Sequence, residues 1–240
     1  MITMSLLRAI KSDLSAIPRY AKHSINKYFL RSTKPDDKTR ATAIIMPGYA
    51  YPPSGFRNIS LRLEEEKIRS KLWSYGFWKE YNYLRGINSY VQEITEEIID
   101  NYYKPGREIY LIGHSLGGLI QRDVLSRLPE PESLVKAAVF IGAPNKGTYA
   151  ALYNFFVPVC KDMLPRSEYL TELNKKSLPG NIPITNIISR HDLCILPWHS
   201  ARLPKQENIE EIILHDEGHL AITDRTDLIL RGLKRQILAY

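Results

Sequence analysis

A glycine-rich turn between an apolar strand and a helix constrains the fold of this chain more than any other feature. Residues 109–112 form a short, partly β-branched apolar run, which predicts a buried strand. Apolar residues recur at helical spacing over 119–128, which predicts a helix. The six residues between these segments read GHSLGG. Because Gly113 and Gly117 leave room for a strained backbone, we expect Ser115 on a sharp turn from strand to helix.

Ser115 at this turn has two interpretations. It can simply cap the following helix, as serine often does. Alternatively, the turn lifts its hydroxyl above the C-terminal edge of the sheet. The helix N-terminus would then place backbone N–H groups beside an oxyanion formed there. The predicted strand and helix on either side favour this second interpretation, in which Ser115 is a nucleophile.

The GHSLGG turn resembles the nucleophile elbow of the α/β-hydrolase superfamily, in the form common among bacterial triacylglycerol lipases and esterases. Residues 140–148, FIGAPNKGT, resemble the G-[TA]-P-x-x-G-[ST] segment of these lipases. The resemblance runs from about residue 42 to residue 220. It implies an α/β-hydrolase fold, with a mostly parallel central sheet, helices on both faces and a cap insertion. It also implies a lipase or esterase that cleaves carboxylic esters of lipid-like acyl groups through an acyl-enzyme, without a cofactor or metal.

The superfamily arranges its catalytic residues in the chain order Ser, Asp, His. His219 lies between the last predicted strand and the final helix, where the superfamily keeps its histidine; His215 is the runner-up and His199 a weaker candidate. Asp192 follows a predicted strand, and the residues after it resemble the D-x-[IV]-V-P segment of the family. On its own, Asp192 would be interpreted as a turn aspartate that accepts local backbone N–H groups. The resemblance predicts a triad of Ser115, Asp192 and His219.

The loop after the first central strand is expected to complete the oxyanion hole. The family usually has His-Gly here, whereas this chain has Pro47-Gly48. Because backbone N–H groups do the work, the hole survives this departure. By position, its donors would be the N–H groups of Tyr49 and Leu116. Residues 51–55 can also be interpreted as a proline-rich surface turn.

The remaining pattern alternates strands with helices, which predicts a parallel sheet covered on both faces. Strands are predicted at 42–46, 70–77, 109–112, 135–141, 182–189 and 211–214. Helices are predicted at 59–68, 88–102, 119–128 and 224–240. Right-handed crossovers would connect such strands.

One segment, residues 148–179, is longer than a connection between strands needs. It holds many apolar side chains: Tyr149, Tyr153, Phe155, Phe156, Val157, Val159, Met163 and Leu164. By its position we expect it to form a cap that binds an acyl chain over the active site. The alternative is a helical insertion packed on the surface.

At 240 residues the chain fits one domain, for which we expect residues 41–240, preceded by a basic arm over residues 1–40. Nine Lys and Arg against three Asp give the arm +6 of the net charge of +7. Because no nucleic-acid-binding motif accompanies this charge, we expect no nucleic-acid partner.

Apolar residues at helical spacing predict an amphipathic helix near the start of the arm: Leu7, Ile10, Leu14 and Ile17. Such a helix usually packs on its own domain. Because the arm is basic and carries Tyr20, Tyr28 and Phe29, a peripheral membrane contact is the alternative.

Cys160 and Cys194 are the only cysteines, and their spacing fits no metal site. They are either two buried free thiols or a disulfide that ties the 148–179 segment to the loop of Asp192. No apolar run approaches the ~20 residues that span a bilayer. The first residues also lack the features of a secretory signal. We therefore expect a cytoplasmic protein, associated with membranes only peripherally.

Two other functions fit the same residues. An acyltransferase would use the same triad but pass the acyl group to an alcohol instead of water. A non-catalytic lipid-binding domain on a hydrolase fold is the third interpretation. The presence of all three catalytic elements argues against it.

Overall fold

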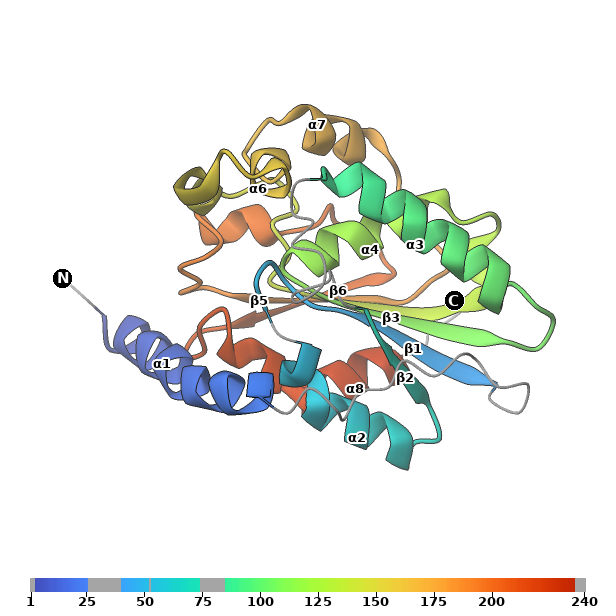
Figure 1. The fold of residues 1–240 in the computed structure, drawn as a ribbon, viewed down its shortest axis with the longest axis horizontal. Coiled ribbons are helices and arrows are strands. Elements are labelled where there is room, and N and C mark those ends of the chain that lie inside the picture. Colours follow the sequence, from blue (N-terminus) through green and yellow to red (C-terminus); the bar gives the residue numbers. More distant parts are fainter. Residues whose placement is uncertain (1–2, 26–39, 52, 74–84, 236–240) are drawn as a thin grey trace.

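The computed structural model describes residues 3–25, 40–51, 53–73 and 85–235 (Figure 1). Within them, six strands form one sheet in the order β2-β1-β3-β4-β5-β6. The strands are β1 (Ala41–Met46), β2 (Arg69–Leu72), β3 (Glu108–His114), β4 (Val135–Ile141), β5 (Ile184–Ser189) and β6 (Ile209–Leu214). All neighbouring pairs are parallel, which confirms the predicted parallel sheet.

The connections between these parallel strands contain α-helices, except the connection from β5 to β6, which contains only a short 3₁₀ turn. The α-helices are α1 (Met4–Ile25), α2 (Arg57–Glu65), α3 (Ile87–Tyr102), α4 (Leu116–Arg127), α5 (Pro131–Leu134), α6 (Pro158–Asp162), α7 (Glu168–Lys175) and α8 (Thr226–Lys234). Short 3₁₀ turns are η1 (Pro53–Phe56), η2 (Tyr149–Asn154), η3 (Trp198–Ala201) and η4 (Ala221–Asp224). The predicted second strand ends at Leu72; residues 74–77 of that prediction and the end of the last predicted helix lie outside the described residues.

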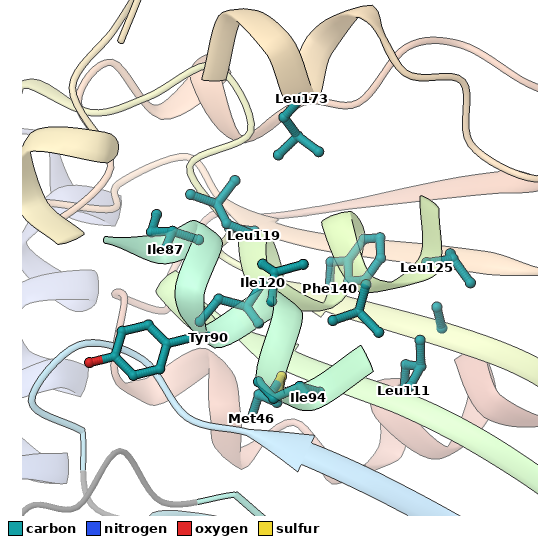
Figure 2. Packing of buried hydrophobic residues seen from close by; sticks show 14 of the residues in the cluster. Met46, Ile87, Tyr90, Ile94, Leu111, Leu119, Ile120, Leu125, Phe140 and Leu173 are labelled. Atoms are coloured by element: carbon teal, nitrogen blue, oxygen red, sulfur yellow. The ribbon is translucent and has the colours of Figure 1, made fainter. Parts of the chain in front are cut away.

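The sheet separates two hydrophobic cores. Figure 1 shows α3, α4, α6 and α7 over one face, and α1, α2 and α8 over the other. Figure 2 shows the first core, where Leu111 and Phe140 of the sheet lie beside Ile94 of α3 and Ile120 of α4. Because both faces are covered, β5 is buried along its whole length, as a near-continuous apolar strand requires.

The 148–179 segment contains η2, α6 and α7, and its apolar side chains divide between two environments. Val159, Met163 and Leu173 are buried in the first core. By contrast, Tyr153, Phe155 and Phe156 are 86%, 62% and 73% exposed. The segment is therefore anchored by α6 and α7, while η2 and the residues after it present aromatic rings to solvent. Its predicted role as an acyl-binding cap stays a prediction.

Helix α1 packs on the domain through small residues and not through the large apolar residues from which the helix was predicted. Ala9 and Ala16 are fully buried, whereas Leu7 and Leu14 are 47% and 61% exposed. Small side chains let the helix approach closely, which leaves the larger apolar residues on its outer face. Tyr28 and Phe29 of the predicted arm lie outside the described residues. Among the described helices, none is long and apolar enough to cross a membrane.

Candidate active site

Ser115 lies at the junction of β3 and α4, as predicted. Its backbone has φ 52° and ψ −121°, a combination that is strained for a residue with a side chain. The Ser115 N–H donates to the Ile141 carbonyl oxygen at the end of β4, over 2.8 Å, which holds the turn against the sheet. The serine is thus fixed in a strained backbone conformation at the C-terminal edge of the sheet.

Two glycines permit this turn by close approach. A Cβ on Gly117 would lie 2.3 Å from the Met46 carbonyl oxygen, so only glycine lets α4 come this near to β1. A Cβ on Gly48 would lie 2.9 Å from Ser115 Cβ. The loop after β1 therefore touches the serine directly, where an oxyanion hole would require it.

Asp192 and His219 form a hydrogen-bonded pair. Asp192 Oδ2 lies 2.6 Å from His219 Nδ1, and both side chains are buried. The other carboxylate oxygen, Oδ1, accepts the N–H groups of Cys194 and Ile195, each over 2.8 Å. Asp192 is thus a turn aspartate and the partner of a histidine at once. Its local hydrogen bonds aim the remaining oxygen at the imidazole.

The hydrogen bond with Asp192 sets the proton positions on His219. An ionised carboxylate only accepts hydrogen bonds, so Nδ1 carries the proton and Nε2 is left as the basic nitrogen. Burial alone lowers the pKa of His219, but the charge and hydrogen bond of Asp192, with the charge of Asp13, outweigh it and raise the pKa above 6.5. The alternative candidates His215 and His199 are exposed.

His114, which the sequence analysis left without a role, lies against His219. The two rings are 4.6 Å apart at their centroids, and His114 Nε2 lies 3.1 Å from the His219 carbonyl oxygen. Because a carbonyl only accepts, Nε2 of His114 carries the proton. Full burial, together with the nearby His219, drives the pKa of His114 well below 6.5, so this ring is neutral. The only sequence signal for it was its position beside Ser115.

The structure joins two of the three predicted triad residues directly. Within the described part of the chain, Asp192 and His219 share a hydrogen bond, whereas none links Ser115 to His219. Ser115 is connected to them through its neighbour His114, whose ring packs on His219. Hydrogen bonds to a nucleophile are often long before substrate binds. The catalytic role of Ser115 stays a prediction.

The two predicted oxyanion donors belong to the residues that follow Gly48 and Ser115, which lie against each other. Leu116 is the first residue of α4, and the first N–H groups of a helix have no acceptor within the helix. Tyr49 lies in a turn closed by the Tyr51 N–H, which donates to the Gly48 carbonyl oxygen over 3.2 Å. Tyr51 itself is buried, and its hydroxyl lies 2.7 Å from Thr223 Oγ1, so it does not belong to a surface turn.

The FIGAPNKGT segment connects the 148–179 segment to the loop that carries Asp192. Thr148 Oγ1 donates to the Cys194 carbonyl oxygen and accepts the Leu196 N–H, each over 2.8 Å. The Tyr149 N–H also donates to the Leu196 carbonyl oxygen over 2.9 Å. The position of Asp192 thus depends on this motif. Thr148 is a supporting residue that sequence reasoning did not single out.

Cys160 and Cys194 are free thiols, as one of the two interpretations predicted, but only Cys160 is a buried residue, whereas Cys194 is exposed. The Cys194 Sγ lies within 4.8 Å of donor atoms of Asp192 and His219, so these groups could face a metal ion. However, burial and the charges of Asp192 and Asp13 raise the pKa of the Cys194 thiol to about 12, which disfavours the thiolate that binds metals. Both Asp192 oxygens are also engaged in hydrogen bonds. The donor set fits proton transfer better than metal binding.

A hollow of about 670 Å³ lies at the opposite end of the strands from Ser115. It is lined by residues that include Glu108 at the start of β3 and Pro183 just before β5. Ligands of open α/β sheets bind at the carboxyl ends of the strands. This hollow is therefore not the candidate active site.

The sequence matches no family model, and no curated protein matches it either. Solved structures resemble the fold. A Bacillus licheniformis lipase, BlEst2, has 11% identity and a TM-score of 0.62, covering 84% of this chain and 94% of that one. A bromoperoxidase from Bacillus anthracis has 15% identity and a TM-score of 0.59, with coverage of 82% and 93%. Lipase B of Aspergillus fumigatus has 15% identity and a TM-score of 0.55, and this chain, matched over 74% of its length, spans 45% of that lipase.

These likenesses and the parallel sheet show that the chain has the α/β-hydrolase fold, as its sequence predicted. Ser115, Asp192 and His219 follow β3, β5 and β6. Because the carboxyl ends of parallel strands meet at one edge, the fold brings the three positions to the same edge of the sheet.

Proposed function

We propose that this protein is a serine hydrolase that cleaves carboxylic esters through an acyl-enzyme. The observation that carries the proposal is the buried Asp192–His219 hydrogen bond, which leaves Nε2 of the imidazole as a base. The strained backbone of Ser115 at the same edge of the sheet supports its role as the nucleophile.

In the proposed reaction, Ser115 Oγ attacks the ester carbonyl carbon while His219 Nε2 takes the hydroxyl proton. Asp192 stabilises the resulting imidazolium. The N–H groups of Tyr49 and Leu116 would bind the oxyanion of the tetrahedral intermediate. His219 then gives the proton to the leaving alcohol, which breaks the ester bond. Water, deprotonated by His219, attacks the acyl-enzyme and releases the carboxylic acid and Ser115.

We further propose that the acyl groups are lipid-like. The exposed rings of Tyr153, Phe155 and Phe156 give the 148–179 segment an apolar surface suited to an acyl chain. The bond from Thr148 to the loop of Asp192 supports a position of this segment near the proposed triad. Two of the similar structures are described as lipases, which supports the same substrate class.

A series of p-nitrophenyl esters from short to long acyl chains tests the proposal. We expect hydrolysis that increases with chain length and is lost in Ser115→Ala. Ser133→Ala, which changes an exposed serine on α5, should match the wild type. Full activity of Ser115→Ala would overturn the proposal. With an added alcohol, dominant formation of the new ester would instead identify an acyltransferase, and a folded protein inert toward every ester would point to a binding domain.

We also propose that the outer face of α1 contacts an anionic lipid surface. Met4, Leu7 and Leu14 are exposed on it, and Lys11 lies exposed among them. A basic helix with an exposed apolar stripe suits the interface of a membrane with acidic headgroups.

Sedimentation with vesicles of acidic or neutral phospholipid tests this contact. We expect binding to the acidic vesicles, weakened by salt and lost in Leu7→Ser/Leu14→Ser. Leu61→Ser, a change at an exposed leucine of α2, is the control and should bind like the wild type. Equal binding by the double variant would exclude α1 as the contact.

A further inference from the structure

One turn of α1 holds the backbone on both sides of His219. Ser12 Oγ accepts the Gly218 N–H over 2.9 Å. Asp13 Oδ1 accepts the N–H groups of Leu220 and Ala221 over 2.8 and 3.0 Å. Three backbone N–H groups that flank the histidine are therefore bound by two adjacent side chains from the far end of the chain.

The contact between α1 and this loop is tight. A Cβ on Gly218 would lie 2.2 Å from an Asp13 carboxylate oxygen, so only a glycine fits between the loop and the helix. Fully buried Ala9 and Ala16 lie one turn to either side and bring the helix close. Another α1 residue, Ser5, lies 2.7 Å from His191, the residue before Asp192. The helix thus reaches the loops of both members of the acid–base pair.

We propose that Asp13 is a positioning residue for His219, and that α1 supports the active site through this contact. The inference rests on the proposed function, in which His219 is the base. The orientation of an imidazole follows its backbone, and here Asp13 fixes that backbone immediately after the histidine. A catalytic side chain keeps its geometry only when supporting residues hold it in place.

Asp13 also acts on His219 by its charge. The groups that face the imidazole are Asp192 after β5, Asp13 on α1, His114 at the end of β3 and the protonated Cys194 thiol. The pKa of Asp13 is raised overall by its burial and by the charge of Asp192, although its hydrogen bonds to the Ala221 and Leu220 N–H groups and the nearby His219 oppose this rise. An ionised Asp13 adds to the effect of Asp192 and raises the pKa of His219. Removal of that charge should therefore make His219 easier to deprotonate.

Two substitutions in the full chain separate these effects. Asp13→Asn keeps an oxygen that accepts the two N–H groups but removes the charge. We expect a near-normal kcat at neutral pH. In the profile of kcat/KM against pH, we expect the acid limb to move to lower pH. Asp13→Ala removes the acceptor as well, and we expect kcat per titrated active site to fall about 10- to 100-fold with little change in KM. Asp216→Asn removes an exposed carboxylate from the same loop and should leave both quantities unchanged.

The titration of the His219 side chain by ¹⁵N NMR provides a readout that does not depend on ester hydrolysis. Asp13→Asn should move this titration to lower pH, and Asp216→Asn should not. Identical titrations in the wild type and Asp13→Asn, or a normal kcat in folded Asp13→Ala, would overturn the inference. If the wild type hydrolyses no ester while the titration still moves, the proposed function fails but the action of Asp13 on His219 stands.

Discussion

At the scale of single residues, the Asp192 carboxylate orients the candidate base because its two oxygens bind different partners. Oδ1 is anchored by two backbone N–H groups, and Oδ2 holds the imidazole of His219. Asp192→Asn would present an amide whose N–H can donate to Nδ1 of His219. The imidazole would then be held in the tautomer that carries its proton on Nε2, which is wrong for a base at that nitrogen. We expect kcat to fall by about 10⁴ while the fold is retained. Steady-state kinetics with circular dichroism check this, and a loss smaller than tenfold would contradict it.

His114 should make the protein sensitive to acid. Its pKa is lowered in the folded state, so the unfolded chain binds a proton there below pH 6.5 that the folded chain does not. Stability is therefore lost as pH falls below 6.5, by at most about 1.4 kcal/mol per pH unit for one group. His114→Gln keeps an N–H donor for the His219 carbonyl oxygen but cannot titrate. Urea unfolding at several pH values should show a shallower loss in this variant, and equal slopes would contradict the assignment.

Gly48 should tolerate no side chain. A Cβ there would lie 2.9 Å from Ser115 Cβ and 3.0 Å from His114 Nδ1, so Gly48→Ala must displace the loop or the serine. We expect a loss of about 10- to 100-fold in kcat. Gly180→Ala adds the same methyl group where nothing lies within 4 Å, and it should be neutral. Equal activity of the two variants would show that the loop after β1 does not shape the site.

At the scale of elements, Thr148 joins the 148–179 segment to the loop of Asp192. Thr148→Val keeps the shape of this buried side chain but removes the acceptor of the Leu196 N–H and the donor to the Cys194 carbonyl oxygen. We expect the free energy of unfolding to fall by about 1–3 kcal/mol. The matched change Thr171→Val, at an exposed hydroxyl that bonds within α7, should cost less than about 0.5 kcal/mol. Denaturant unfolding compares the two, and equal small losses would contradict the connecting role of Thr148.

The elements themselves follow from local patterns, but their partners do not. The boundaries of β1 and β4 lie within one residue of the predicted runs, because continuous apolar strands are a strong local signal. Helix α1 was predicted from Leu7, Ile10, Leu14 and Ile17, yet the fully buried residues of its described part are Ala9 and Ala16. Which face packs depends on the shape of a surface assembled from distant residues. The sequence does contain a signal for this face, because small and polar residues recur at helical spacing along it: Ala9, Ser12, Asp13 and Ala16.

At the scale of the whole molecule, the parallel sheet brings the carboxyl ends of β3, β5 and β6 to one edge, as the sequence predicts. The motifs around Ser115, Asp192 and His219 predicted that each residue follows a strand, and the restricted topology of such sheets then brings the ends of these strands together. The supports of the site were not predictable. His114 packs on a residue 105 positions away, and Asp13 bonds to one 207 positions away. Contacts of this range are set by the completed fold and not by local periodicity.

The most direct test of the account is covalent labelling of the protein with a fluorophosphonate, followed by mass spectrometry of the intact chain and its peptides. We predict one adduct per chain on the peptide that contains Ser115, no adduct in Ser115→Ala, and slow labelling in Asp192→Asn. A folded wild type that stays unlabelled, or an adduct that persists in Ser115→Ala, would contradict the assignment of Ser115 as the nucleophile.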